Sequence, residues 1–288
     1  MKIQRKPDWL KIRMEAGEHY TEVKQTVEEH RLHTICDSGK CPNRNHCWSL
    51  GTATFMIMGD ICTRSCKFCA TKSGRPEPLD ENEPEKIARS ISLMKLKHCV
   101  LTSVDRDDLP DKGARHWAET VKAIRHFNPE VVIELLIPDY RETLLDIVLE
   151  TSPDIVGHNL ETVKRLTPSV RSRATYENSM EVLRSISRSG RVAKTGIMVG
   201  LGESQAEVAD LMEECREAGC RMITIGQYLQ PTKQNIEVSE YIHPDLFRYY
   251  KKMGEALGYE SVESSPLVRS SYMAERSFLE ALQTSGRR

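Results

Sequence analysis

The sequence predicts an α/β fold in which helices cover a parallel β-sheet. From residue 51 onward, six short apolar runs alternate with segments of helical periodicity, and the connections between them are short. Six βα units in succession require a parallel sheet, which either stays open or curls into a full or partial barrel. Both arrangements place ligands at the carboxyl ends of the strands. The expected strands are residues 54–58, 99–104, 131–137, 154–156, 192–199 and 222–227.

Two of the expected helices carry residues typical of helix ends. Ser204 and Glu207 form the pattern of a capping box, and Gly219 follows as a C-terminal stop. Asn178 is expected to begin the preceding helix in the same way, and Gly190 to end it. The helices between and after the strands are expected at residues 84–94, 115–127, 141–150, 179–189, 204–218 and 244–257.

Both ends of the chain break the alternation, and we expect them to pack on the central domain. Residues 1–50 form an N-terminal extension, in which a short amphipathic helix at 21–31 precedes a cysteine-rich loop. Residues 51–263 form the βα core. Residues 264–288 form a C-terminal extension.

Composition and charge are those of an ordinary globular protein. The 288 residues include 41 basic and 42 acidic side chains, which are interspersed and give a net charge of −1. No nucleic-acid-binding surface is indicated. The longest apolar segments are far shorter than the roughly 20 residues that a membrane span needs, and the N-terminus lacks the apolar core of a signal peptide. We therefore expect a cytoplasmic protein with no nucleic-acid or membrane partner.

The chain has nine cysteines, an odd number that argues against complete disulfide pairing. Reducing conditions in the cytoplasm also disfavour a disulfide framework. Six of the nine lie between positions 36 and 69, and ligation of a metal or cluster explains that clustering better. The other three, Cys99, Cys215 and Cys220, are expected to be buried thiols with a packing role.

Cys62, Cys66 and Cys69 have C-x3-C-x2-C spacing and follow the first expected strand. Three thiolates can hold three irons of a [4Fe–4S] cluster and leave the fourth iron open, whereas four thiolates would close the cluster. The alternatives are chance spacing or a zinc site that recruits His46 as its fourth ligand. An iron–sulfur cluster is favoured because the loop lies where chemistry is expected, at the carboxyl end of the sheet.

This loop, with Phe68 just before its last cysteine, resembles the signature of the radical S-adenosylmethionine superfamily. The resemblance implies a partial (βα)6 TIM-like barrel with the two extensions packed on it. It also implies that the open iron binds the methionine moiety of S-adenosylmethionine, and that cleavage of the sulfonium gives a 5′-deoxyadenosyl radical. Phe68 is then expected among the cofactor-binding residues.

Cys36, Cys41 and Cys47 form a second set, with C-x4-C-x5-C spacing. On spacing alone they hold a second cluster, a structural zinc with His46, or no ligand. Their position shortly before the first set resembles the lipoyl synthase family. The tail Arg269-Ser270-Ser271-Tyr272 matches that family's Arg-Ser-Ser-Tyr motif, which implies that Ser271 ligates an auxiliary cluster.

Polar residues after the strands also resemble the superfamily. By that resemblance Thr102, Ser103 and Asp105, at the carboxyl end of the second strand, contact the methionine amino group. Asn159 and Glu161, after the fourth strand, contact the ribose.

Other candidates are weaker. The glycines of the motif Gly196-x-Met198-x-Gly200 allow close approach to the cofactor by the same resemblance. Arg171 and Arg173 are expected on a solvated helix face. The tryptophans are expected to be packing residues, namely Trp9, Trp48 and Trp117.

The resemblance to the lipoyl synthase family implies sulfur insertion at C6 and C8 of a protein-bound octanoyl-lysine. Two S-adenosylmethionine molecules are consumed, and the auxiliary [4Fe–4S] cluster supplies both sulfur atoms. The implied partners are octanoylated lipoyl carrier domains (2-oxoacid dehydrogenase subunits and the glycine cleavage carrier protein) and a flavodoxin or ferredoxin reductant. Two other hypotheses are a different two-cluster radical enzyme that inserts sulfur and a non-catalytic zinc-binding protein.

Overall fold

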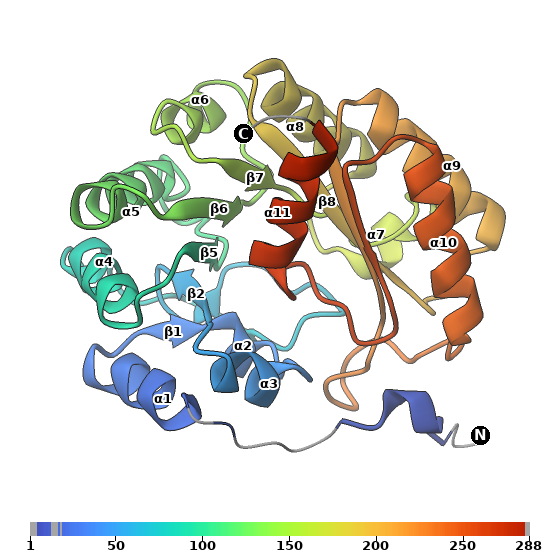
Figure 1. Ribbon diagram of the computed structural model, residues 1–288, viewed down its shortest axis with the longest axis horizontal. Coiled ribbons are helices and arrows are strands. Elements are labelled where there is room, and N and C mark those ends of the chain that lie inside the picture. Colours follow the sequence, from blue (N-terminus) through green and yellow to red (C-terminus); the bar gives the residue numbers. More distant parts are fainter. Residues whose placement is uncertain (1–4, 13–16, 18, 286–288) are drawn as a thin grey trace.

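The computed structural model describes residues 5–12, 17 and 19–285 and contains the predicted parallel sheet (Figure 1). Within those residues one eight-stranded sheet has the order β1-β2-β5-β6-β7-β8-β9-β10. Its six central strands are parallel neighbours and match the six that the sequence predicts. The α/β class with a partial barrel is therefore confirmed. These strands are β2 (Thr54–Ile57), β5 (His98–Ser103), β6 (Val132–Leu136), β7 (Ile155–Gly157), β8 (Val192–Val199) and β9 (Met222–Gln227).

The two edge strands were not predicted. β1 (His33–Thr34) runs antiparallel to β2, and β10 (Ser261–Ser264) runs parallel to β9. β1 is too short to give a periodic signal, and β10 includes the acidic Glu263, which is buried. β10 spans the boundary that we expected between the core (51–263) and the C-terminal extension (264–288). A separate two-stranded sheet pairs β3 (Ile61–Cys62) with β4 (Lys72–Ser73) around the C-x3-C-x2-C loop.

Helices cover the outer face of the sheet, as Figure 1 shows. Those that follow the central strands are α4 (Glu83–Leu93), α5 (Ala114–Phe127), α6 (Thr143–Leu149), α8 (Tyr176–Arg188), α9 (Gln205–Glu217) and α10 (Pro244–Ala256). Shorter or additional elements are η1 (Asp8–Leu10), α1 (Tyr20–Glu29), α2 (Ile35–Ser38), α3 (Arg44–Ser49), η2 (Lys164–Leu166), α7 (Thr167–Val170) and α11 (Ala274–Ser285). Among the described helices, none combines the length and the hydrophobicity needed to cross a membrane.

The helix ends test the two capping predictions. The capping box of α9 is confirmed, since Ser204 and Glu207 bond each other's backbone N–H groups, and Gly219 follows with φ +91°. For α8 the expected C-terminal stop is confirmed, since Gly190 follows the C-cap with φ +80°, but the expected start was wrong. Thr175 is the N-cap, and its hydroxyl accepts the backbone N–H of Asn178. Thr175 is extended and lies three residues before Asn178, so the helix starts earlier than expected.

The core is apolar and continuous across the sheet. Cys99, Cys215 and Cys220 are fully buried in or beside it, which confirms their predicted environment. Trp48 and Trp117 are also buried, whereas Trp9 is exposed and contacts the ring of His243.

A buried charged cluster lies on the concave side of the sheet. Lys194 of β8 bonds Glu134 of β6, and His98 of β5 lies 3.2 Å from the same carboxylate. β6 and β8 are separated by β7, so side chains that meet across it share the inner face. The unpredicted helix α11 packs nearby, with the ring of Phe278 against His98.

Candidate active site

The loop that carries Cys62, Cys66 and Cys69 is fixed at the carboxyl ends of β2 and β5. The backbone N–H of Thr63 donates to the carbonyl of Asp105 at 3.0 Å, and that of Gly74 donates to the carbonyl of Cys62 at 2.9 Å. These bonds close the loop on itself and join it to the segment after β5. The sequence-predicted position at this end of the sheet is thus observed.

The Cys62 thiol lies in a polar backbone pocket. Its sulfur accepts the backbone N–H groups of Arg64 at 3.4 Å and Asp105 at 3.3 Å. Burial, together with the nearby Asp105 carboxylate, raises the pKa of Cys62 to about 11. Two N–H donors aimed at one sulfur are suited to a thiolate that ligates iron, because hydrogen bonds to the sulfur tune an iron–sulfur centre.

Arg64 joins the cysteine loop to the ends of two more strands. Its guanidinium contacts the carboxylates of Asp105 at 3.3 Å, Asp107 at 2.8 Å and Asp139 at 2.7 Å. The hydrogen bonds from Arg64 hold the pKa of Asp107 at about 2. Because the Arg64 side chain is only 7% exposed, these ion pairs act in a weakly screened environment. Sequence reasoning missed Arg64.

Cys66 and Cys69 complete this set. The Cys66 sulfur lies 3.4 Å from the hydroxyl of Ser172, and burial raises the pKa of Cys69. Cys69 is close to both other thiols, because it raises the pKa of Cys62 and its own pKa is raised by Cys66. The Asn235 side chain donates to the carbonyls of Lys67 at 3.1 Å and Cys69 at 2.9 Å, so the segment after β9 also holds this loop.

The second set of cysteines lies on α2, α3 and the turn between them. Cys36 is in α2, and its carbonyl accepts the backbone N–H of Cys41 at 3.0 Å. Cys47 is in α3. Burial, together with the nearby Cys36 and Cys41 thiols, raises the pKa of Cys47 to about 12, so the three thiols are neighbours.

The C-terminal tail reaches this second set. Asn43 donates from its side chain to the carbonyl of Leu267 at 2.6 Å, and the Thr54 hydroxyl donates to that of Ser271 at 2.8 Å. Burial lowers the pKa of the neighbouring Arg269, while the Cys41 thiol acts in the opposite direction. Segments more than 200 residues apart in sequence therefore meet beside Cys41.

The polar residues at the carboxyl end of β5 and after β7 lie at the same end of the sheet. Thr102 donates its hydroxyl to the carbonyl of Leu136 at 3.2 Å, and the Ser103 hydroxyl is buried without a partner among the described residues. Asn159 donates to the Ser270 hydroxyl at 2.7 Å. Glu161 has φ +69°, and burial raises its pKa.

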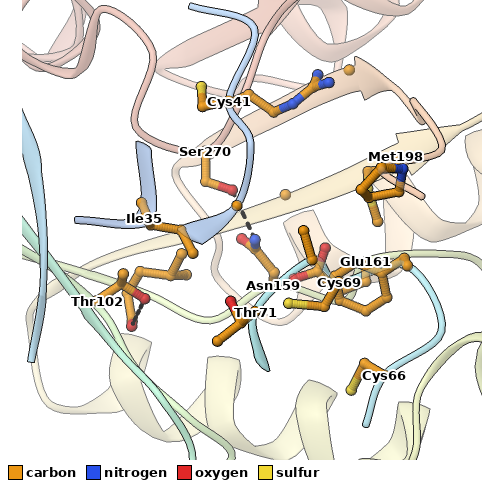
Figure 2. Close-up of a pocket in the computed structure, with 18 of the residues that line it drawn as sticks. Ile35, Cys41, Cys66, Cys69, Thr71, Thr102, Asn159, Glu161, Met198 and Ser270 are labelled. Carbon is orange, nitrogen blue, oxygen red and sulfur yellow. Dashed lines mark hydrogen bonds between the residues drawn. The ribbon is translucent and has the colours of Figure 1, made fainter. Parts of the chain in front are cut away.

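One cavity of about 490 Å³ connects both cysteine sets (Figure 2). Cys47 does not line it and instead packs with Trp48 and Val23. Phe68 lines the cavity and packs against Tyr228. All the other candidate site residues line it too, namely Cys36, Cys41, Cys62, Cys66, Cys69, Thr102, Ser103, Asp105, Asn159, Glu161 and Ser271.

Arg171 also lines the cavity, so its expected position on a solvated helix face was wrong. It follows the short helix α7, which the sequence did not predict, and donates to the Asn159 carbonyl at 3.2 Å and the Ser179 hydroxyl at 2.7 Å. Arg173 is exposed, as expected, and pairs with Asp107.

The donor set is chemically suited to iron–sulfur clusters. All nine cysteines lie within the described residues and are free thiols. No three His, Cys, Asp or Glu side chains among the described residues converge closely enough to hold a single metal ion. Five of the six thiols in the two sets line the cavity, and the sixth, Cys47, lies beside Cys36 and Cys41.

Comparison with known families and structures agrees with this geometry. Residues 56–215 match the family model described as the radical SAM superfamily. The chain is also similar in fold to the solved structures of methylornithine synthase (TM-score 0.58, 13% identity, covering 85% of this chain and 71% of that one) and of the FeFe-hydrogenase maturase HydG from Carboxydothermus hydrogenoformans (TM-score 0.58, 14% identity, covering 91% and 68%).

Full-length relatives are much closer in sequence. The chain is 60% identical over 274 residues to lipoyl synthase of Bacteroides fragilis, covering 94% of this chain and 95% of that protein. It is 54% identical over 278 residues to lipoyl synthase of Treponema denticola, covering 96% of each. This chain therefore belongs to the lipoyl synthase family of the radical SAM superfamily.

Proposed function

We propose that this enzyme inserts two sulfur atoms, at C6 and C8, into an octanoyl chain carried on a lysine of a lipoyl carrier domain. Two molecules of S-adenosylmethionine are consumed, one for each C–H bond. The observation that carries the proposal is the single cavity that both cysteine sets and Ser271 reach. A shared cavity lets one substrate carbon be activated from one side and receive sulfur from the other.

In this proposal each cysteine set holds one [4Fe–4S] cluster. Cys62, Cys66 and Cys69 hold the first and leave one iron open for the cofactor. Ser271, together with the other set, Cys36, Cys41 and Cys47, holds the second. A serine oxygen binds iron less well than a thiolate, which suits a cluster that gives up sulfur. When bound, the first cluster supplies the electron that cleaves the cofactor, and the second supplies the sulfur atoms.

In this proposal the remaining cavity residues bind and orient S-adenosylmethionine. Thr102, Ser103 and Asp105 face the methionine amino group in this proposal. Asn159 and Glu161 face the ribose. Phe68 contributes apolar contact, and the cavity-lining cation Arg171 attracts the methionine carboxylate.

The proposed partners follow from this chemistry. A lipoyl carrier domain, from a 2-oxoacid dehydrogenase or the glycine cleavage system, presents the octanoyl-lysine, and a flavodoxin or ferredoxin delivers electrons. Six ligating thiols must remain reduced, so we propose the cytoplasm as the compartment. We also propose three working parts: the extension 1–50, the core 51–263 and the extension 264–288.

Anaerobic reconstitution tests the cluster assignment. The proposal predicts a brown protein with about eight irons per chain, from two four-iron clusters. A colourless protein with stoichiometric zinc would refute it.

A pair of matched alanine variants separates the two sites. Cys66→Ala should abolish reductive cleavage of S-adenosylmethionine. Cys41→Ala should leave cleavage intact and stop sulfur insertion into an octanoylated carrier peptide, as measured by mass spectrometry. Lipoyl product from Cys41→Ala would show that the sulfur-donor assignment is wrong.

A further inference from the structure

The two adjacent serines of the tail bond to different segments of the cavity wall. Ser271 accepts the hydroxyl of Thr54, whose backbone N–H in turn bonds the Cys36 thiol. Ser270 instead accepts the side-chain amide of Asn159, at 2.7 Å (Figure 2). One dipeptide of the tail is therefore linked through Thr54 to the second cysteine set, and directly to Asn159 at the expected ribose position.

The Ser270–Asn159 contact is built into the surrounding backbone. A Cβ atom on Gly196 would lie 2.5 Å from the Thr224 hydroxyl, 2.9 Å from the Asn159 side-chain oxygen and 3.3 Å from the Ser270 hydroxyl. Only glycine leaves room for these three polar groups to meet over β8. The glycine motif of this strand thus accommodates protein side chains as well as allowing close approach to a ligand.

Asn159 also contacts Glu161, another residue that lines the cavity. Burial raises the pKa of Glu161, and a hydrogen bond from Asn159 opposes that effect, so the two side chains are in contact. Glu161 is held by the backbone as well, since its N–H donates to the Gly196 carbonyl at 3.1 Å and its carbonyl accepts the N–H of Met198 at 2.9 Å. Ser270, Asn159 and Glu161 therefore form one connected row.

We infer that Ser270 is a positioning residue that couples cofactor binding to the ordering of the C-terminal tail. The inference rests on the proposed function, in which Asn159 and Glu161 contact S-adenosylmethionine. Ser270 fixes the Asn159 amide, so the pocket is arranged for the cofactor only when the tail is docked. Coupling between two sites is reciprocal, so a bound cofactor also holds the tail, and with it Ser271, in place.

The test measures binding of S-adenosylmethionine to the anaerobically reconstituted full chain by equilibrium dialysis. Ser270→Ala removes one hydrogen bond and should weaken binding about three- to tenfold, with the iron content unchanged. Ser265→Ala is the matched control in the same tail, because its hydroxyl makes no hydrogen bond among the described residues, and it should bind like the wild type. In an Asn159→Ala background, Ser270→Ala should have no further effect.

Hydrogen exchange of the wild type gives a readout that needs no variant. Addition of S-adenosylmethionine should slow exchange in residues 265–273. Equal affinity of the wild type and Ser270→Ala, or unchanged exchange in the tail, would overturn the inference while leaving the proposed function intact. A wild-type protein that does not bind S-adenosylmethionine at all would refute the proposed function itself.

Discussion

A single methyl group added at Gly226, in β9, should disturb the second proposed cluster site and leave the first intact. A Cβ atom there would lie 2.2 Å from the Val268 carbonyl oxygen and 3.3 Å from the Arg269 guanidinium. Contacts of Cβ below 3.0 Å essentially do not occur, so the tail must move by about 1 Å. The contacted Val268 oxygen belongs to the backbone, so rotation of a flexible side chain cannot absorb this shift. Ser271, three residues later, moves with it.

Gly226→Ala should therefore damage the second cluster and spare the first. Misplacement by about 1 Å can reduce a rate roughly 100-fold, so sulfur insertion should fall by about that factor. Iron content should drop from about eight toward four per chain. Reductive cleavage of S-adenosylmethionine should stay within about tenfold of the wild type, the range allowed for loss of the Ser270 contact.

The assay compares iron content, cofactor cleavage and lipoyl product in Gly226→Ala and in a control, Gly74→Ala. The control adds the same methyl group, whose nearest contact is Ile61 at 3.5 Å, an ordinary van der Waals distance. It should retain both clusters and full product formation. If Gly226→Ala kept eight irons and wild-type product formation, the tail would not hold the second cluster in the manner described.

Two further predictions concern the charged groups. Lys194→Met removes the cationic partner of the buried Glu134, and loss of one member of such a pair costs about 3–5 kcal/mol of unfolding free energy, measurable by denaturant titration. A loss below about 1 kcal/mol would contradict this. The pKa of Asp107 is held at about 2, below its ordinary 3.8, so its stabilising contribution is present above about pH 4 and is lost as the pH falls through 2. Asp107→Asn should therefore flatten the dependence of stability on pH in that window, and an unchanged slope would exclude Asp107 as its source.

The sequence predicts the central sheet well because local signals and tertiary structure agree there. The six buried strands read as apolar runs, and the capping box of α9 is a purely local motif. β1 and β10 escaped prediction because their strand identity comes from pairing at the sheet edges. The α8 start was misplaced because Thr175 and Asn178 are both suitable caps, and only the extended backbone of Thr175 decides between them.

Some residues of the candidate site can likewise be predicted from the sequence, whereas others cannot. Cysteine spacing and the Arg-Ser-Ser-Tyr tail are visible in the sequence, and they drew attention to residues that line one cavity. Arg64, Arg171 and Asn235 carry no such signal, because each acts on groups that the fold brings from distant segments. Their roles depend on the packing of loops after different strands. No periodicity or motif encodes that packing.

In the proposed reaction, one cavity joins a radical-generating site to a sulfur-donating site of the same chain. The most direct test is to reconstitute the protein with isotopically labelled sulfide, remove all free sulfide, and supply an octanoylated carrier peptide with S-adenosylmethionine and a reductant. Mass spectrometry should find two labelled sulfur atoms in each lipoyl product. A product that contains unlabelled sulfur, or no sulfur while the cofactor is cleaved, would contradict the claim.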